Sequence, residues 1–378
     1  MMGAFCTPPS KHNFPAVTIC RFLFCCCPAL LMRVVLVMGA LATFSQTVGA
    51  DEPPTGAVRG LLPRSDEPRN RESPPMIVIL GGTNAHEMQR HGYLETQLAV
   101  AAPEAVPRFR NLAWQADTVY RQQRPRNFFL DGLAAPNQDP DHRGRIPADT
   151  IVLWMGQSEA LDARSSDAFA TAYGQLVEKL RPFAHRLVLV TPVPFEDPLK
   201  IGVDLEKRNE RLAQHAQIIR SIAREKHLDL VDLNGAASRE KENKMRTRDG
   251  VHLSADGHWW VAEELAKRLQ QGEQAEPQVL VAEPAWPKVQ LSEGAEQVRQ
   301  KILTKNQLWM RYWRPTNWAF LYGNRQFVES SRDHVNYKVR WFPAAVESIA
   351  SPINQAEVEI QAAAKAANAA NKVNPNPE

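Results

Sequence analysis

The sequence predicts an α/β protein in which helices cover both faces of a parallel β-sheet. Four short runs rich in Val, Ile and Leu have the composition of buried parallel strands: 76–80, 150–155, 186–192 and 228–233. Stretches with the apolar spacing of helices lie between or after these runs: 85–102, 165–183, 205–226 and 256–271. This alternation is typical of a parallel sheet, whose sites form in the loops at the carboxyl ends of the strands.

The first 50 residues differ from the rest of the chain in charge and in cysteine content. They contain three basic residues and no acidic one, so the remainder is neutral, with 42 basic groups (45 − 3) against 42 acidic ones. All five cysteines lie in the same stretch, which excludes a disulfide, a thiolate metal site or a cysteine nucleophile elsewhere. A neutral body without a basic stripe also argues against nucleic acid as a partner.

The same 50 residues predict a signal peptide. After Met32, which is a second candidate start, one arginine precedes a short apolar run that ends in Val48-Gly49-Ala50, similar to a signal-peptidase site. We therefore expect an exported protein, periplasmic or extracellular, with no stable membrane span after cleavage. The alternative is an uncleaved N-terminal anchor. Residues 51–75, rich in Pro, Arg and acidic residues, predict a disordered lead-in.

The composition changes again after the predicted sheet domain, residues 76–272. The segments that follow are a linker, a helical aromatic-rich extension and a frayed tail: 273–290, 291–368 and 369–378. Four tryptophans lie in the extension: Trp309, Trp313, Trp318 and Trp341. Such residues either bind a sugar or a partner, or pack a helix against the main domain, and we favour packing.

Three short blocks place polar side chains at predicted strand ends. The first, Gly81–Asn84 (Gly-Gly-Thr-Asn), puts a hydroxyl at a strand-to-helix turn, near a helix N-terminus that favours negative charge. The second, Gly156–Glu159 (Gly-Gln-Ser-Glu), follows the strand at 150–155. The third, Asp249–His252 (Asp-Gly-Val-His), precedes the last helix of the sheet domain. An Asp three residues before a His can orient the imidazole to act as a general base.

The order of these blocks, with Arg110–Trp114 between the first and the second, resembles the SGNH (GDSL-like) hydrolases. The resemblance covers residues 75–272, and the tail with Asn306–Pro315 is similar to the extension of a group of such proteins from planctomycete-type bacteria. It implies a flavodoxin-like, three-layer α/β/α fold with a five-stranded parallel sheet. It also implies ester hydrolysis by Ser and His with support from an Asp, and no cofactor or metal.

Transferred to this sequence, the resemblance makes Thr83 the nucleophile, His252 the general base and Asp249 the residue that orients His252. The family has a serine where this chain has Thr83, and an acidic residue where it has Gly82. A threonine hydroxyl can attack when a base removes its proton, although its methyl group crowds the attack path. The alternative interpretations are a turn threonine that caps the following helix and a hydrogen-bonded loop histidine.

The resemblance also implies the groups that hold the oxyanion. They are the N–H groups of Thr83 and Ala113 and the hydroxyl of Ser158, with Gly156 in the same site. The family has a glycine at the position of Ala113 and an asparagine at that of Ser158. Ala113 still offers a backbone N–H. Because one lost oxyanion donor costs about 10²–10³ in rate, Ser158 in place of the asparagine predicts a slower enzyme unless its hydroxyl reaches the oxyanion. Ser158 as the nucleophile is a weaker alternative, since no helix follows it directly.

Other histidines and acidic residues have structural interpretations. His86 and His91, five residues apart on a predicted helix, are expected on the surface or as caps. Asp139–His142 is expected to be a polar loop rather than a metal site, because no partner ligand stands out.

The sequence therefore predicts an ester hydrolase that acts on a small-molecule or glycan ester, such as an acyl group on a carbohydrate or lipid. The alternative is a catalytically inactive relative that binds a glycan or a protein partner in the envelope. Substitutions at three of the four signature positions favour this alternative.

Overall fold

A computed structural model of the chain describes residues 74–122, 148–202, 204–239, 244–270, 281–283, 290–321 and 323–373. The predicted signal peptide, nearly all of the lead-in and the Asp139–His142 loop lie outside these residues. Within them, no helix is both apolar enough and long enough to cross a lipid bilayer.

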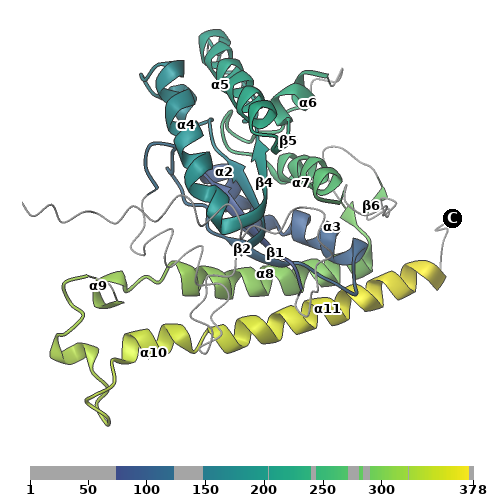
Figure 1. The fold of residues 1–378 in the computed structure, drawn as a ribbon. Helices are drawn as coiled ribbons and strands as arrows, with labels where there is room; N and C mark the ends of the chain where they lie inside the picture. Colours follow the sequence, from purple (N-terminus) through teal and green to yellow (C-terminus); the bar gives the residue numbers. More distant parts are fainter. Residues whose placement is uncertain are drawn as a thin grey trace, which may run out of the picture. The chain divides into compact units, whose positions relative to one another are not determined.

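Five parallel strands form one sheet, as predicted, in the order β2-β1-β3-β4-β5 (Figure 1). Their bounds are Met76–Gly81 (β1), Arg108–Asn111 (β2), Ala148–Trp154 (β3), Ala184–Val190 (β4) and Asp229–Val231 (β5). The chain leaves β1 in one direction to reach β2, and it proceeds from β3 in the other direction to β4 and β5. In sheets of this order, ligands bind where the direction reverses, at the carboxyl ends of the first and third strands.

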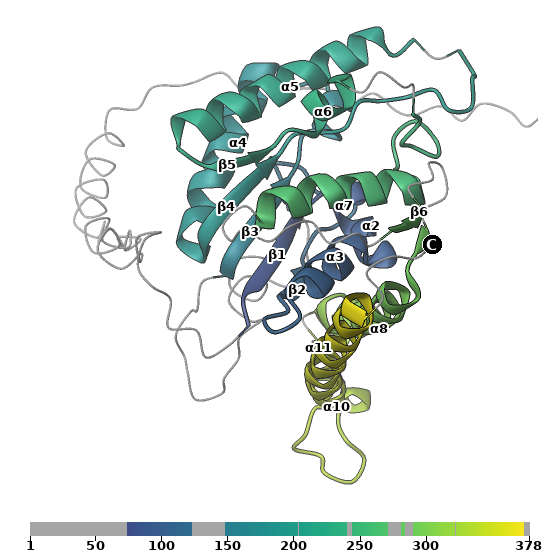
Figure 2. The ribbon, with the colours of Figure 1, turned by 90° about the vertical axis from the view of Figure 1, so that its right-hand side faces the viewer.

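Alternate side chains of β1 enter two different cores, as the period of a strand requires. Val78 and Leu80 pack with α4 (Ser166–Leu180) and α5 (Glu206–Glu225) on one face of the sheet. Ile77 and Ile79 pack on the other face. The helices there are α2 (Thr83–His91), α3 (Tyr93–Ala101), α6 (Leu233–Arg239) and α7 (Ala255–Gln270). The two cores on opposite faces of the sheet confirm the expected α/β/α arrangement, and Figure 2 looks onto the sheet with α7 and α3 on the viewer's side.

Two local features differ from the sequence prediction. The expected helix over 85–102 is broken at Gly92, whose φ of 69° ends α2 in the left-handed region and starts α3. Strand β2 is an edge strand of sequence Arg-Phe-Arg-Asn, and it lacks the apolar run by which the other strands were found. Its Arg110 is buried because the guanidinium is paired with Glu357, 247 residues away in the chain.

The C-terminal extension is helical. Its elements are α8 (Glu293–Trp313), α9 (Trp318–Leu321), a 3₁₀ turn (Glu329–Ser331), α10 (Trp341–Glu347) and α11 (Ala350–Val373). Two short antiparallel strands, β6 (Val281–Glu283) and β7 (Gln290–Leu291), precede α8 in the stretch predicted as a linker. Helix α11 continues to Val373, inside the segment predicted to fray.

Helices α8 and α11 lie side by side and against α3 (Figures 1 and 2). Trp309, Tyr312 and Trp313 of α8 enter the same core as α4 and α5. Trp318 and Trp341 are exposed instead. The packing interpretation therefore applies to two of the four tryptophans of the extension.

Candidate active site

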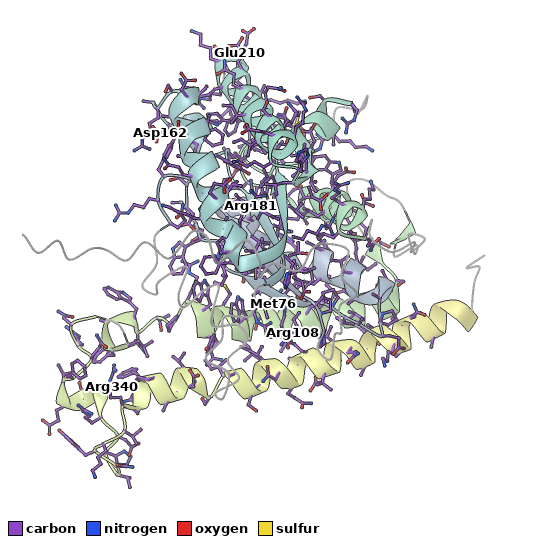
Figure 3. The ribbon with its side chains drawn as sticks, viewed as in Figure 1. Met76, Arg108, Asp162, Arg181, Glu210 and Arg340 are labelled. Atoms are coloured by element: carbon purple, nitrogen blue, oxygen red, sulfur yellow. The ribbon has the colours of Figure 1, made fainter. Side chains whose placement is uncertain are left out.

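The site residues lie at the carboxyl ends of β1, β2 and β3, where the strand order reverses. Gly81 makes the tight turn from β1 into α2: a Cβ at this position would stand 2.4 Å from Trp154 O and 2.5 Å from the Cβ of Ala85. Figure 3 shows Met76 and Arg108, near the amino ends of β1 and β2, beside the extension. Asp162, which follows β3, and Glu210, in the first half of α5, lie at the opposite end of the sheet domain.

Asp249 and His252 form a directly bonded pair on the loop before α7. His252 Nδ1 lies 2.8 Å from Asp249 Oδ2, and the His252 backbone N–H donates to Asp249 Oδ1 at 2.7 Å. Burial alone would raise the pKa of the Asp249 carboxyl, but hydrogen bonds from the backbone and imidazole of His252 and from the Val251 N–H lower it to about 2. The aspartate is therefore ionised at neutral pH and holds Nδ1–H, which leaves Nε2 to take a proton.

Both side chains of this pair reach solvent. The imidazole of His252 is 35% exposed and the Asp249 carboxylate 41%. The pair is thus accessible to a substrate, as a general base must be.

Asn84 joins all three blocks, a role that the sequence analysis did not assign. Its Nδ2 donates to Gln157 Oε1 at 2.7 Å and to Val251 O at 2.9 Å. Its Oδ1 accepts the Leu253 N–H at 3.0 Å. The residues on either side of His252 are therefore fixed to the residue after Thr83. In the sequence, Asn84 is one polar residue at the start of a predicted helix. Its need for hydrogen-bond partners follows from its burial, which only the fold shows.

Thr83 is the first residue of α2 and is half-buried. Gly82 is the N-cap, and no side chain caps this helix end. The interpretation of Thr83 as a capping threonine is therefore wrong. Among the described residues, the Thr83 hydroxyl has no hydrogen-bond partner, and the imidazole of His252 bonds to Asp249 alone. Thr83 and His252 are thus brought to the same edge without a hydrogen bond between them.

The predicted oxyanion donors differ in whether they already donate a hydrogen bond within the protein. The Ala113 N–H donates to Asn111 Oδ1 at 2.9 Å, and the Gly156 N–H donates to Glu159 Oε2 at 2.9 Å. Both groups are therefore engaged within the protein. Ser158 is exposed, and its Oγ lies 3.7 Å from the place that a Cβ on Gly82 would occupy, so this hydroxyl stands beside the start of α2.

Glu159 is a second residue whose role the sequence analysis missed. Its carboxylate is buried and accepts the N–H groups of Val119, at 2.7 Å, and Gly156. Burial raises its pKa, and the backbone hydrogen bonds counteract that rise only in part. Glu159 therefore anchors the turn at Gly156, where φ is +116°, to the loop that follows β2.

The two histidines of α2 are not surface residues, contrary to the prediction. His86 is buried beneath the loop after β2, with Nδ1 3.2 Å from Ala113 O. His91 is half-buried and stacks on the buried His258, with ring centroids 4.3 Å apart. Both were misplaced because the extension and α7 cover this helix.

Two cavities lie outside these blocks. One, of about 310 Å³, lies between α3, β2 and the extension, with Glu95, Arg108, Lys305 and Glu357 in its lining. The other, of about 440 Å³, is lined by Ala160, Leu161, Lys207, Arg208 and Arg211. In the described part of the chain, no cluster of three or more His, Cys, Asp or Glu residues is arranged to hold a metal ion.

Comparison with known proteins identifies the sheet domain. A search of solved structures gave three examples of similar chains. One is an acetyl xylan esterase, with TM-score 0.37 and 18% identity, over 51% of this chain and 98% of that one. A second is from Slackia heliotrinireducens, described as an SGNH hydrolase, with TM-score 0.39 and 19% identity, over 52% and 100%. The third is an acetylxylan esterase from Geobacillus stearothermophilus, with TM-score 0.39 and 16% identity, over 54% and 96%.

All three TM-scores lie below 0.5, so it is the family match that identifies the domain. No curated protein has a significant match to the chain. The model of the GDSL-like Lipase/Acylhydrolase family matches residues 80–260, which include all three blocks. Residues 80–260 therefore belong to the GDSL-like lipase/acylhydrolase family, the SGNH hydrolases.

Proposed function

We propose that the sheet domain hydrolyses an acyl ester with Thr83 as nucleophile and His252 as general base. The observation that carries this proposal is the Asp249–His252 pair, which is exposed to solvent and tied through Asn84 to the uncapped start of α2. Membership of a family of lipases and acylhydrolases supports ester hydrolysis in general.

In the proposed reaction, Thr83 Oγ1 attacks the ester carbonyl while His252 Nε2 takes its proton. The tetrahedral intermediate collapses, the C–O bond to the alcohol breaks, and His252 returns the proton to the departing oxygen. Water then attacks the acyl-threonine with the same histidine as base, which releases the carboxylic acid and restores Thr83. Asp249 stabilises the imidazolium at each stage. Nucleophile–base hydrogen bonds often form only in the substrate complex.

The oxyanion would be held at the start of α2. The first N–H groups of a helix have no partner inside it, and the helix dipole favours negative charge there. Because the N–H groups of Ala113 and Gly156 already donate within the protein, we assign this role to the first turn of α2 together with the Ser158 hydroxyl.

The proposed substrate is an acyl ester of a carbohydrate or lipid outside the cytoplasm. Export is inferred from the leader sequence, and the acyl-ester class from the family. The mechanism requires no cofactor or metal.

The test is hydrolysis of short-chain nitrophenyl esters and acetylated sugars by the chain from Asp51. We expect His252→Ala and Thr83→Ala each to lower the rate about 10²–10⁴-fold, while Thr83→Ser retains it. The matched control is His185→Ala, because His185 is exposed and lies at the opposite end of the sheet, in β4. A rate that survives Thr83→Ala but not His252→Ala would make Ser158 or a water the attacking group.

The second candidate function is binding without catalysis, at the same site. It is favoured by the two engaged N–H groups and by the missing hydrogen bond between Thr83 and His252. A folded chain with no turnover above that of its variants, but with measurable affinity for an acylated glycan, would decide for this function.

A further inference from the structure

Arg314, at the end of α8, reaches the back of the candidate site. Its guanidinium carbon lies 3.7 Å from the centroid of the Trp114 ring, within the range of a cation–π contact. Its Nη1 lies 3.3 Å from His86 Nε2. One side chain of the extension thus touches both α2 and the loop that follows β2.

This contact fixes the tautomer of His86. A guanidinium can only donate hydrogen bonds, so His86 Nε2 must accept, and the ring proton resides on Nδ1. Nδ1 in turn faces Ala113 O at 3.2 Å and donates to it. Gln89 Nε2, also 3.2 Å from Nδ1, donates to the His86 carbonyl at 2.9 Å. Burial, reinforced by Arg314, lowers the pKa of His86 to about 4, so the ring is neutral at pH 7.

The two segments that Arg314 joins, α2 and the loop after β2, both lie next to Thr83. His86 lies one helical turn after Thr83 on α2. The loop after β2 is bonded to the same corner: the Trp114 N–H donates to Gly81 O at 3.1 Å, and Asp117 O lies 3.4 Å from the Cβ position of Gly82. A shift of this loop would therefore displace the start of α2, where the nucleophile and the oxyanion donors lie.

The rest of α8 holds Arg314 in place. Trp309 Nε1 donates to Asn111 O at 2.8 Å, and Asn306 Nδ2 donates to Gln89 O at 3.1 Å. The buried Lys305 pairs with Glu95. These contacts give Arg314 the rigid support that a positioning residue needs.

We propose that Arg314 is a positioning residue of the active site, which acts through His86 and Trp114 to hold the loop after β2 against the first turn of α2. The C-terminal extension is thereby a working part of the site and not only a cover for the sheet. The catalytic part of this inference rests on the proposed esterase function.

The experiment compares Arg314→Ala, Arg314→Gln and Arg314→Lys with the control Arg311→Ala in the full mature chain. Arg311 is exposed and lies almost one turn earlier on α8. We expect Arg314→Ala to lower kcat about 10- to 100-fold, because misplacement of reacting groups costs rate, with KM changed less than about twofold. Arg314→Lys, which still donates to His86, should recover most of kcat. Arg311→Ala should match the original chain.

A second readout does not depend on turnover. The ¹⁵N spectrum of labelled histidine should show His86 protonated on Nδ1, and Arg314→Ala should shift it towards the Nε2 tautomer and move the amide signals of Thr83 and Ala113. If Arg314→Ala does not fold, Arg314→Gln, which keeps one donor, takes its place. Unchanged kcat, tautomer and amide signals would overturn the proposal, as would equal effects from Arg311→Ala. A chain without turnover but with the expected spectral changes would refute the esterase and leave the positioning role standing.

Discussion

The candidate site and the contact between α8 and the sheet domain use polar side chains in opposite ways. At the site, the Asp249–His252 pair reaches solvent and the Thr83 hydroxyl has no partner among the described residues. In the contact, Lys305 is 1% exposed and paired with Glu95, and Asn306 makes two hydrogen bonds. Groups available for chemistry therefore differ from groups that stabilise the fold, with Arg314 as the proposed link between the two regions, and substitutions should distinguish them.

The largest effect is expected in the contact, at Trp313. This side chain is 2% exposed in the core that α4 and α5 also line. Trp313→Ala should lower the free energy of unfolding by about 3–5 kcal/mol, the usual cost of removing a buried aromatic side chain. Trp318→Ala is the control, because Trp318 is 51% exposed, and it should cost less than about 0.5 kcal/mol. Urea unfolding measures both, and similar losses would show that the two halves of the extension do not differ in packing.

Lys305 gives a test of nearly the same size in a charged pair. Lys305→Ala leaves the Glu95 carboxylate without its cation in a buried site and should cost about 3–5 kcal/mol. The control is Lys301→Ala on the same helix, whose pair with Glu359 is exposed and worth less than about 1 kcal/mol. Ester hydrolysis by the folded fraction should change little in Lys301→Ala, whereas Lys305→Ala also removes a contact that supports Arg314. Equal stability of Lys305→Ala and Lys301→Ala would contradict the difference between the buried and the exposed pair.

Acid should weaken the fold through histidines that are buried and neutral. Burial lowers the pKa of His86 from 6.5 to about 4 and that of His258 well below 6.5. Below pH 6.5 the unfolded chain protonates these histidines, whereas the folded chain keeps them neutral down to the lowered pKa. The folded state therefore has its full stability above pH 6.5 and loses stability as the pH falls through the folded pKa. For His86, a pKa of about 4 in place of 6.5 corresponds to no more than roughly 3–4 kcal/mol.

Urea unfolding at pH 7.5 and at pH 4.5 measures this effect. His86→Gln should reduce the loss of stability between the two pH values, whereas His185→Gln, at an exposed position, should leave it unchanged. Equal stability at the two pH values would mean that the buried histidines relax to accept a proton.

The sequence predicted the fold class well because four of the five strands lie in apolar runs, which the fold buries completely in β1 and for the most part in β3 and β4. It did not locate β2, because the two arginines of this strand find partners only in the folded chain, as Arg110 does with Glu357. The blocks were found from spacing, yet Asn84 and Glu159 were not assigned roles, since their partners come from loops far away in the chain. The split among the tryptophans likewise depends on the folded chain, because Trp309 and Trp313 lie on α8 in the sheet core, whereas Trp318 and Trp341 begin α9 and α10.

The dependence of the sheet on α8 and α11 has a consequence for when the chain can fold. The bond from Trp309 to Asn111 spans 198 residues, and the pair of Glu357 with Arg110 spans 247. Contacts between residues so far apart in the sequence form slowly. Until they form, the edge strand exposes unpaired N–H and C=O groups that can pair with other chains. The edge at β2 therefore stays open until α11, which carries Glu357, has left the ribosome. The export proposed above requires an unfolded chain, and a core that is completed so late is compatible with that requirement.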